Sequence, residues 1–436
     1  MKKSVILIGF ASLLLIGILG VGIVSAQDKI NLVYWSMWNA TEGQALVLQD
    51  AITQYEAANP NVTISAVWNG RQNQTLVRTA LSAGTQIDLM DQDEDQIAGG
   101  LQRAGQGLPL NDLLKQPALD HNGAISDVFL PGTLNMFDFN GQTYLMPYIY
   151  NTVQFWYDKR VFKDAGVEPP ATFDDLLAMC PKLKAANYAP IAAEGDGYDN
   201  FYLTELVERQ KGAGWLRQAA ADPTGEMWKD PAVLNAAKMT RQLWDTGCIP
   251  PETTGYAWPQ GQNTLAYGQS GMELVGSWIP IELSSATDPA FDWGAFSFPS
   301  VAGGAGKQTD IYALLLAFMI NKDTKHPQEA FDFLRTLMTD KVQQEFTDKA
   351  FVGVTNKYIT WSAKIADAQK AAASATTTYG DMDNIASLYS EYNTTILGPA
   401  WRDLWLGKST PEQFVDKISS TSKAYWDAHP QATPSS

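Results

Sequence analysis

Apolar and polar side chains follow two different periods near the start of the chain. Residues 30–35 are rich in apolar, β-branched and aromatic side chains, and residues 62–68 alternate apolar with polar positions. Both stretches therefore predict β-strands. Between them, Thr41 and the three residues after it resemble a capping box, which predicts a helix over residues 41–58.

The same alternation continues with a predicted helix at residues 74–82 and a short strand at residues 87–90. Strands that alternate with helices predict a parallel sheet with crossover helices. Ligands of such sheets bind beyond the carboxyl ends of the strands. This rule places residues 36–41, 69–73 and 91–95 on one rim.

The rest of the chain repeats this organisation and predicts a second α/β unit. Short apolar stretches predict strands at residues 143–146, 153–157, 273–275 and 312–320. Helical periodicity and helix-start signals predict helices at residues 172–186, 202–211, 233–244, 326–338 and 411–426. We expect an α/β protein with no internal repeat and a disordered tail at residues 431–436.

The first 26 residues have the pattern of a secretory signal peptide. Lys2 and Lys3 precede an uncharged, mostly apolar run at residues 5–24, and a Val-Ser-Ala site ends at Ala26. We expect cleavage after Ala26 and export of the remaining chain. An uncleaved membrane anchor is the alternative, because a run of about 20 apolar residues can span a bilayer. No cysteine ends the run, so a lipoprotein anchor is excluded.

Length and charge narrow the possible classes of protein. A chain of 436 residues is too long for one ordinary core and suggests two domains. The formal net charge is −16, and removal of Lys2 and Lys3 with the signal segment lowers it to −18. Such a surface repels nucleic acid and anionic lipid, so we expect no nucleic-acid partner. The 14 tryptophans and 17 tyrosines mostly suit a core, but some of these rings are available for binding.

Cys180 and Cys248 are the only two cysteines. In an exported protein they are compatible with one disulfide. The sequence does not show whether their Cβ atoms meet. Two buried free thiols are the alternative.

Common catalytic and metal-binding motifs are missing. His121, His326 and His429 are scattered, and no cysteine pair has zinc spacing. No phosphate-binding glycine-rich loop follows a strand. Ser270 lacks the second glycine that a nucleophile elbow needs.

Three acidic residues match the start of a calcium-binding loop, but the rest of the loop pattern is missing. Asp91, Asp93 and Asp95 have the first spacing of such a loop, whereas Gln96 replaces its turn glycine and Gln102 its closing carboxylate. We therefore expect no metal, no cofactor and no enzymatic activity. A hidden pair of glycosidase carboxylates is the remaining alternative, that of a secreted carbohydrate-active enzyme.

Several short motifs, taken in order, resemble those of a known family. They are Leu32-Val33-Tyr34-Trp35, Asp88-Leu89, Leu108-Pro109-Leu110, Asn140-Gly141-Gln142, Tyr157-Asp158-Lys159, Pro170-Ala171-Thr172-Phe173, Gly276-Ser277-Trp278, Ala317-Phe318-Met319-Ile320 and Pro327-Gln328-Glu329-Ala330. This order resembles the extracellular solute-binding proteins of ABC importers, in the sugar-binding group that includes maltose-binding protein. Each motif is weak alone, but the run covers nearly the whole chain after the signal segment.

The resemblance implies a periplasmic-binding-protein-like fold, in which two α/β lobes are joined by a hinge of crossing strands and hold the solute in a cleft. Crossings are implied near residues 149–151, 299–303 and 351–354. The first lobe would hold residues 28–149 and 303–350, and the second residues 152–298 and 355–436. We expect a monomer in the periplasm or at the cell surface that delivers its solute to the permease subunits of an ABC transporter.

The family's ligands in this group are sugars, whose C–H faces stack on aromatic rings and whose hydroxyls bond to polar side chains. Trp278 follows a Gly-Ser pair at a strand end, and Tyr198 lies in a polar loop. Both resemble stacking residues of the family, with lobe core as the alternative for Trp278. Tyr148, Trp258 and Tyr312 are weaker candidates, for which buried packing is favoured.

Polar candidates lie on the predicted rim and at the hinge. The rim supplies Trp38, Asn39 and Arg71, with a solvated surface charge as the alternative for Arg71, whereas Trp35 precedes the rim and suits the core. The resemblance adds Asp93, Asp95 and Asn151. It also matches Gln92 to an aromatic residue of maltose-binding protein, which argues against maltodextrin specificity. Asn151 matches a ligand-contacting glutamate of that protein.

Two kinds of ligand remain open. An uncharged mono- or oligosaccharide is favoured by the resemblance. The alternative is a cationic solute, such as a quaternary amine or a polyamine, held by aromatic rings and by Asp91, Asp93 and Asp95. Arg71 on the same rim argues against a cation.

Overall fold

The first strands and helices alternate as predicted. β1 (Ile30–Ser36), β2 (Val62–Trp68) and β3 (Leu89–Asp93) are parallel and lie in the order β2-β1-β3, with α1 (Gly43–Ala58) and α2 (Asn73–Ser82) between them in the chain. The structure, a computed structural model, describes residues 29–430. The predicted signal segment (1–26) and the predicted disordered tail (431–436) lie outside the described residues.

The capping box predicted at Thr41 is not formed. α1 begins at Gly43 with Glu42 as its N-cap, and the Glu42 side chain makes no cap hydrogen bond. Its carboxylate instead accepts hydrogen bonds from the backbone N–H of Asn39 and from the guanidinium of Arg71. The prediction was wrong because α1 begins one residue later than the box requires, with Glu42 and not Thr41 at the N-cap position.

The strands predicted at residues 143–146 and 153–157 are one continuous strand. β4 (Leu145–Asp158) is 14 residues long. Through Thr152 it pairs with β8 (Asp310–Ile320). It pairs with β6 (Ser270–Gly276) from Val153 and with β7 (Trp293–Phe296) from Phe155. The register with β8 shifts next to Pro147, which has no N–H to donate. A proline therefore marks an irregularity inside the strand and not its end.

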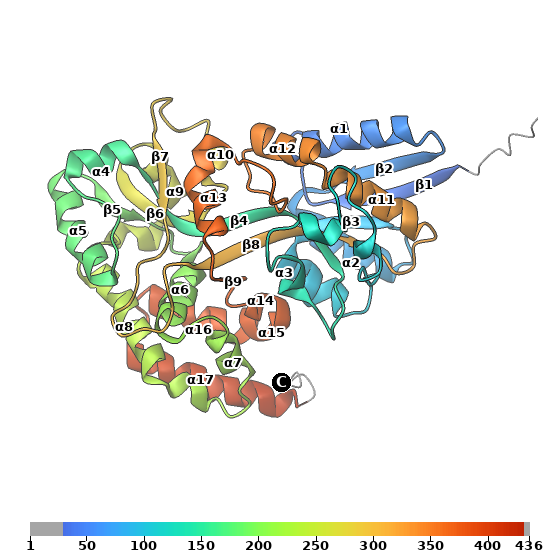
Figure 1. Cartoon of the computed structure of the whole chain (residues 1–436). Coiled ribbons are helices and arrows are strands. Elements are labelled where there is room, and N and C mark those ends of the chain that lie inside the picture. The colour runs from blue at the N-terminus through green and yellow to red at the C-terminus, as the bar shows by residue number, and fades with distance from the viewer. Residues whose placement is uncertain (1–28, 431–436) are drawn as a thin grey trace, which may run out of the picture.

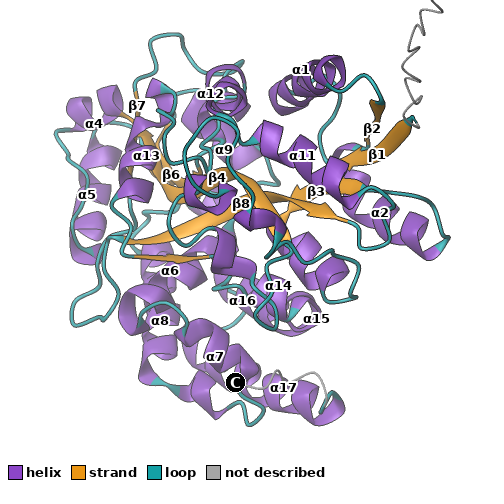
Figure 2. Cartoon of the chain, turned by 45° about the vertical axis from the view of Figure 1, so that its right-hand side comes forward, coloured by secondary structure: helices purple, strands orange, loops and turns teal. Residues whose placement is uncertain are grey.

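β4 and β8 run from one group of elements to the other (Figure 1). The first group contains β1–β3, α1, α2, α3 (Glu94–Gln96), α11 (Pro327–Leu337) and α12 (Asp340–Lys349). The second contains β5 (Ala189–Ala192), β6, β7, β9 (Thr377–Tyr379), α4 (Lys159–Ala165), α5 (Phe173–Ala185), α6 (Asp199–Lys211), α7 (Trp215–Ala221), α8 (Pro231–Asp245), α9 (Gln260–Ala266), α10 (Ile279–Glu282), α13 (Ala366–Ala373), α14 (Ile385–Leu388), α15 (Ser390–Tyr392), α16 (Gly398–Trp405) and α17 (Pro411–Ala428). Helices lie on both sides of the sheet in Figure 2.

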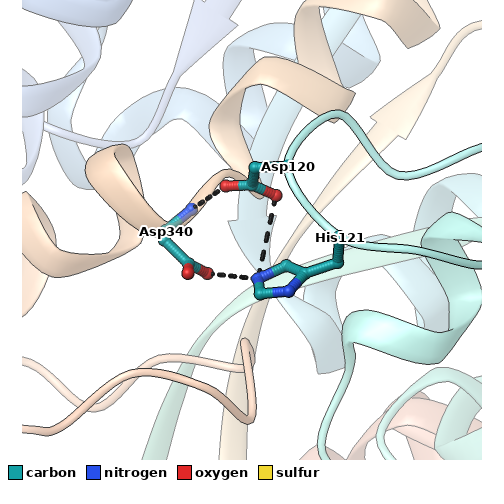
Figure 3. A group of neighbouring side chains, drawn as sticks. All are labelled: Asp120, His121 and Asp340. Atoms are coloured by element: carbon teal, nitrogen blue, oxygen red, sulfur yellow. Dashed lines mark hydrogen bonds and ion pairs between the residues drawn. The ribbon is translucent and has the colours of Figure 1, made fainter.

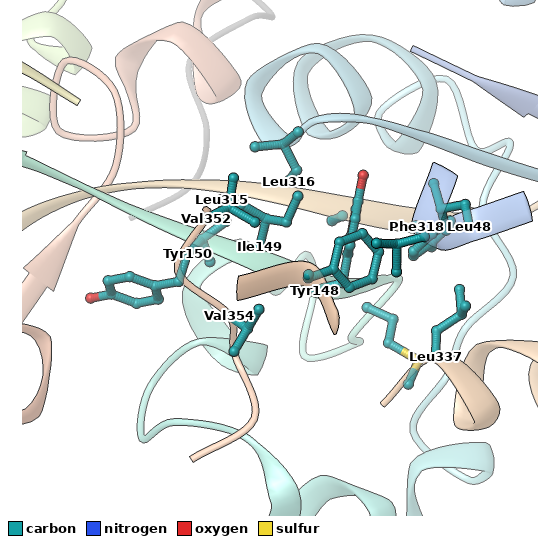
Figure 4. Packing of buried hydrophobic residues seen from close by; sticks show 14 of the residues in the cluster. Leu48, Tyr148, Ile149, Tyr150, Leu315, Leu316, Phe318, Leu337, Val352 and Val354 are labelled. Atoms are coloured by element: carbon teal, nitrogen blue, oxygen red, sulfur yellow. The ribbon is translucent and has the colours of Figure 1, made fainter. Parts of the chain in front are cut away.

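A third segment runs beside the two long strands. Tyr150 N–H donates to the carbonyl of Gly353, and Thr355 N–H donates to that of Tyr148. Figure 4 shows apolar side chains of this segment and of both strands close together, among them Ile149, Leu316 and Val352. Three segments of the chain therefore connect the two groups.

The backbone leaves and rejoins the groups later than residues 303 and 355. Ala305 and Gly306 still donate to carbonyls of α6 in the second group, and β8 then carries the chain across. After the third segment, Ser362 N–H donates to Thr347 of α12 in the first group. The second group is reached at α13, where Asp367 accepts from Ala295 N–H. Because long strands are shared by both groups, the chain passes from one group to the other over several residues and not at a single position.

Other predicted elements are present with their ends displaced by a few residues. The disulfide interpretation of the two cysteines is confirmed: Cys180 on α5 is bonded to Cys248, and their Cα atoms lie 5.3 Å apart. Both residues are fully buried, so the bond joins α5 to the segment after α8 inside the second core. Between residues 29 and 430, no helix combines the length and the hydrophobicity that crossing a membrane requires.

Candidate ligand-binding cleft

A cavity of about 920 Å³ lies between the two groups of elements. The first group lines it with Met37, Trp38, Asn39, Glu42, Arg71, Asp93, Glu94 and Asp95, and the second with Tyr198, Asn200, Phe201, Trp258, Trp278, Ile281, Glu282 and Asp381. The crossing segments add Ile149, Asn151, Leu314, Leu316 and Val352. Its size is typical of a small-molecule site, and its lining mixes aromatic rings with polar groups.

The structure brings all eight ligand-binding candidates together on this cavity. They are Trp38, Asn39, Arg71, Asp93, Asp95, Asn151, Tyr198 and Trp278. Of the weaker candidates, Trp258 also lines the cavity, whereas Tyr148 and Tyr312 are fully buried outside its lining. Trp35 is half-buried and packs against the first core, as expected.

A chain of buried hydrogen bonds supports Trp38. Its Nε1–H donates to Tyr148 Oη over 2.8 Å, and the Tyr148 hydroxyl donates to Asp91 Oδ2 over 2.7 Å. Tyr34 donates to the other oxygen of Asp91, also over 2.7 Å. Burial raises the pKa of Asp91 to about 6, although these hydroxyl donors favour its ionised form. The Trp38 ring is thereby fixed at the end of β1.

Asp91 is absent from the cavity lining, which corrects the cation cage predicted from Asp91, Asp93 and Asp95. Asp91 lies on β3, is fully buried, and accepts hydrogen bonds from two tyrosines. The chain turns from β3 into α3 at Asp93 and Glu94, so strand alternation no longer predicts where the next acids point.

Arg71 is fixed at the rim by three different contacts. Its guanidinium donates to the Met37 carbonyl over 2.9 Å and pairs with the Glu42 carboxylate. The same guanidinium lies over the Trp38 ring, 4.9 Å from its centroid. Gly70 has φ +60°, a conformation that favours glycine and lets the backbone turn tightly here. A Cβ at this position would also overlap the Asn39 side chain. Arg71 is therefore an organised part of the rim whose charge is already paired.

Two half-buried rings form the opposite wall. Trp278 follows β6 and packs against Tyr198, with ring centroids 6.0 Å apart. Any side chain at Gly276 would overlap the Trp278 ring, so this glycine gives the ring its position. Tyr198 stacks on Phe201 at 5.3 Å and has φ +59°, a conformation that non-glycine residues rarely adopt. Such strain is often found at ligand sites.

Four carboxyl residues meet in one part of the lining. Asp93, Glu94 and Asp95 come from the end of β3, and Asp381 follows β9 in the second group. Burial is the main cause that raises the pKa of each of them. Neighbouring carboxylates add to the shift for Glu94, Asp95 and Asp381, whereas the charge of Arg71 opposes it for Asp93. For Asp95 the pKa reaches about 7.

Sequence reasoning missed several lining residues. Glu94 lies between two predicted acids, so the predicted polar loop could have included it. Glu282 follows Trp278 by one helical turn, which was a weak signal. Asp381 and Asn200 belong to no motif, and only the fold places them at the cavity.

One group of possible metal-binding side chains occurs within residues 29–430, away from the cavity. Asp120, His121 and Asp340 have ligand atoms within 4.8 Å of one another (Figure 3). His121 Nε2 is 2.8 Å from Asp340 Oδ1, and Asp340 N–H donates to Asp120. These contacts use the side chains to attach the loop at Asp120 to the start of α12.

Comparisons with known proteins agree with this architecture. The sequence pattern of the family described as bacterial extracellular solute-binding protein matches residues 39–344, more than half of the chain. A binding protein of Brucella abortus is 24% identical over 387 residues, which cover 85% of this chain and 87% of the relative. The multiple sugar-binding protein of Streptococcus mutans is 24% identical over 338 residues, 74% of either chain. A solved structure of a chitin oligosaccharide binding protein shares the fold, with a TM-score of 0.73, 23% identity, and coverage of 91% of this chain and 99% of that one.

Proposed function

Because the chain belongs to the family of bacterial extracellular solute-binding proteins, we propose that it binds a carbohydrate outside the cytoplasm and passes it to the permease of an ABC importer. The ligand would be a mono- or oligosaccharide held in the cavity between the two groups of elements. The observation that carries this proposal is the lining of that cavity, where aromatic rings and polar side chains face the same space.

This lining suits the two surfaces of a sugar. The half-buried rings of Trp278 and Tyr198 offer flat apolar faces to the C–H side of a pyranose. Asn151, Asp93 and Asp95 offer acceptors, and the amide also offers donors, for hydroxyl groups. The names of the Streptococcus mutans relative and of the chitin oligosaccharide binding protein support a sugar ligand for this chain.

The two groups of elements would act as lobes. We place the hinge at the middle of β4, at the start of β8 and at residues 352–355, because these segments connect the groups. With ligand contacts from both sides, closure of the lobes would shield the sugar from water.

The proposal includes no catalysis. Members of the family are binding proteins, and hydrogen bonding to a solute is a sufficient role for the polar side chains of the cavity. Incubation with aryl glycosides and oligosaccharides should therefore release no product. Product release that depends on one carboxylate of the cavity would contradict this expectation.

A thermal-shift panel tests the function most directly. The chain without its signal segment is heated with neutral sugars, amino sugars, polyamines and quaternary amines, because a ligand far above its Kd stabilises the folded state by several kcal/mol. A saturable shift with a sugar supports the proposal. A shift with non-sugar amines alone would favour the cationic solute, which the acidic lining makes the second candidate.

A further inference from the structure

Four carboxyl groups of the cavity lining have no ion pair with a cationic side chain of the described residues. Asp93, Glu94, Asp95 and Asp381 influence one another electrostatically, so they are close in space. Among the described residues, Arg71 is the one cationic side chain that lines the cavity, and its ion pair is with Glu42. Arg71 also favours the ionised form of Asp93 from a distance. The four acids thus form no ion pair with any cationic side chain of residues 29–430.

Glu94 provides an independent observation, a buried carboxyl oxygen without a partner in this part of the lining. It lines the cavity, yet its side chain is only 2% exposed. Oε2 accepts a hydrogen bond from Leu315 N–H over 3.0 Å, whereas Oε1 has no partner. A buried carboxyl oxygen without a partner is costly. A donor supplied by a ligand would remove this cost.

Asp381 is held in place by the second group. Tyr312 donates a short hydrogen bond to its Oδ1, and Asn200 Nδ2 donates to the same oxygen over 2.9 Å. The three residues that follow, 382–384, all have positive φ although none is glycine. Strain of this kind persists where the surroundings fix the backbone. The Asp381 carboxylate is therefore held at the cavity by residues of the second group.

We infer that the sugar carries a protonated amine, which lies among Asp93, Asp95 and Asp381 while a ring face packs on Trp278 and Tyr198. This inference rests on the proposed function and specifies its ligand as an amino sugar. An ammonium group has three donors and no acceptor, so it matches a wall of carboxylates. Charge-assisted hydrogen bonds of this type are stronger than those of a hydroxyl. Because Asp381 belongs to the second group, the ammonium would also join the two lobes.

Matched sugars that differ at one substituent test the inference. Glucosamine, galactosamine and the β-1,4-linked glucosamine oligomers are titrated by calorimetry at low salt and pH 7. Each is compared with the parent hydroxyl sugar and with the N-acetylated form. We expect the amine to bind at least about tenfold more tightly than either partner, as one charge-assisted hydrogen bond provides. The preference should fall as salt screens the charges.

Two variants locate the effect. Asp95→Asn and Asp381→Asn should each reduce the ratio of amine to hydroxyl affinity by about tenfold, because the amide keeps one oxygen that accepts a hydroxyl hydrogen but lacks the charge that favours an ammonium. Glu208→Gln is the matched control, since Glu208 is a buried acid with a raised pKa that lies outside the cavity lining. The Glu208→Gln variant should have the same ratio of amine to hydroxyl affinity as the wild type.

Each outcome is decisive. If the tightest sugar of the panel is neutral or N-acetylated, or if the two aspartate variants keep the wild-type ratio, the inference is overturned and carbohydrate binding stands. If no sugar binds at all, the proposed function fails first and the inference fails with it.

Discussion

Neighbouring acids of this chain have different tasks at the residue scale. Asp91 is buried and accepts hydrogen bonds from two tyrosines, whereas Asp93 and Asp95 line the cavity. Trp38 and Trp278 are both aromatic, but Trp38 is fixed by a hydrogen bond to Tyr148 and Trp278 by the space over Gly276. The surroundings of a side chain thus decide its role more than its type does.

Trp278→Ala separates a binding role from a structural one. The ring is half-buried at the cavity, so its removal should weaken sugar affinity by about 2 kcal/mol or more and leave the fold intact. Calorimetry gives the affinity, and a denaturant melt of the same preparation gives the stability.

Trp228→Ala is the control for a core tryptophan. Trp228 is fully buried in the second core and does not line the cavity, so its loss should cost about 3–5 kcal/mol of stability. A Trp278 variant that melts like this control but binds normally would show that Trp278 is a structural residue.

Glu194→Gln should remove part of the pH dependence of stability. Burial raises the pKa of Glu194 from 4.5 to about 7, and Asp196 and Glu282 add to the shift, while a hydrogen bond from Gln262 N–H opposes it. Between these pH values the folded state holds more protons than the unfolded state. Stability therefore falls as pH rises through this window, by at most about 3 kcal/mol for this group.

Urea melts from pH 4 to pH 8 test this expectation. The variant should gain stability relative to the wild type as the pH increases. Glu252→Gln, a change at an exposed position, should leave the wild-type profile unaltered. Parallel profiles of wild type and Glu194→Gln would refute the assignment.

At the scale of elements, the second group is stabilised by a covalent link as well as by packing. Cys180 on α5 and Cys248 after α8 close a loop with a sequence separation of 68 residues. The helix that carries Cys180 also has a reciprocal cap, in which Thr172 and Asp175 satisfy each other's backbone N–H groups. The disulfide therefore attaches α5 to the segment after α8, and the cap stabilises the start of the helix.

Replacement of both cysteines by alanine should lower the free energy of unfolding by up to about 4 kcal/mol, the loop-entropy value for a loop of this length. Guanidinium melts of the variant and of the wild type measure the difference. The fold of the second group should persist, because its core contains many other buried residues.

The exported wild type provides the control. Mass spectrometry without reduction should show no free thiol, and two free thiols would contradict the disulfide. Reducing agent should lower the wild-type midpoint toward that of the variant and leave the variant unchanged.

At the scale of the whole molecule, a few segments connect two large groups around a cavity (Figure 1). β4 and β8 are each shared by both groups, and residues 352–355 accompany them. A small number of crossing segments is typical of two-lobed proteins that close about a hinge.

Ligand should therefore close the molecule. Small-angle scattering with a saturating sugar should give a smaller radius of gyration than scattering without it, because both groups contribute contacts to the cavity. Trp278→Ala, at a sugar concentration that saturates only the wild type, is the control. Identical profiles with and without bound sugar would place the ligand outside the cavity.

The sequence by itself determined the kinds of local structure and the rim. Period-two and helical patterns predicted β1, β2, α1, α2, α8, α11 and α17 close to their observed positions. The rule that ligands bind beyond the ends of parallel strands was enough to place Trp38, Arg71 and Asp93 on one rim. These predictions succeeded because burial of one segment leaves its own periodic pattern in the sequence.

Only the tertiary structure decided which distant residues meet. It brought Asp381 and Asn200 to the acids of β3, joined Cys180 to Cys248, and made one strand of residues 145–158. It also took Asp91 out of the cavity and gave Glu42 to Arg71 and Asn39 instead of a helix cap. Such outcomes depend on contacts between segments far apart in the chain and on the desolvation that those contacts cause, and no local pattern of side chains records either of them.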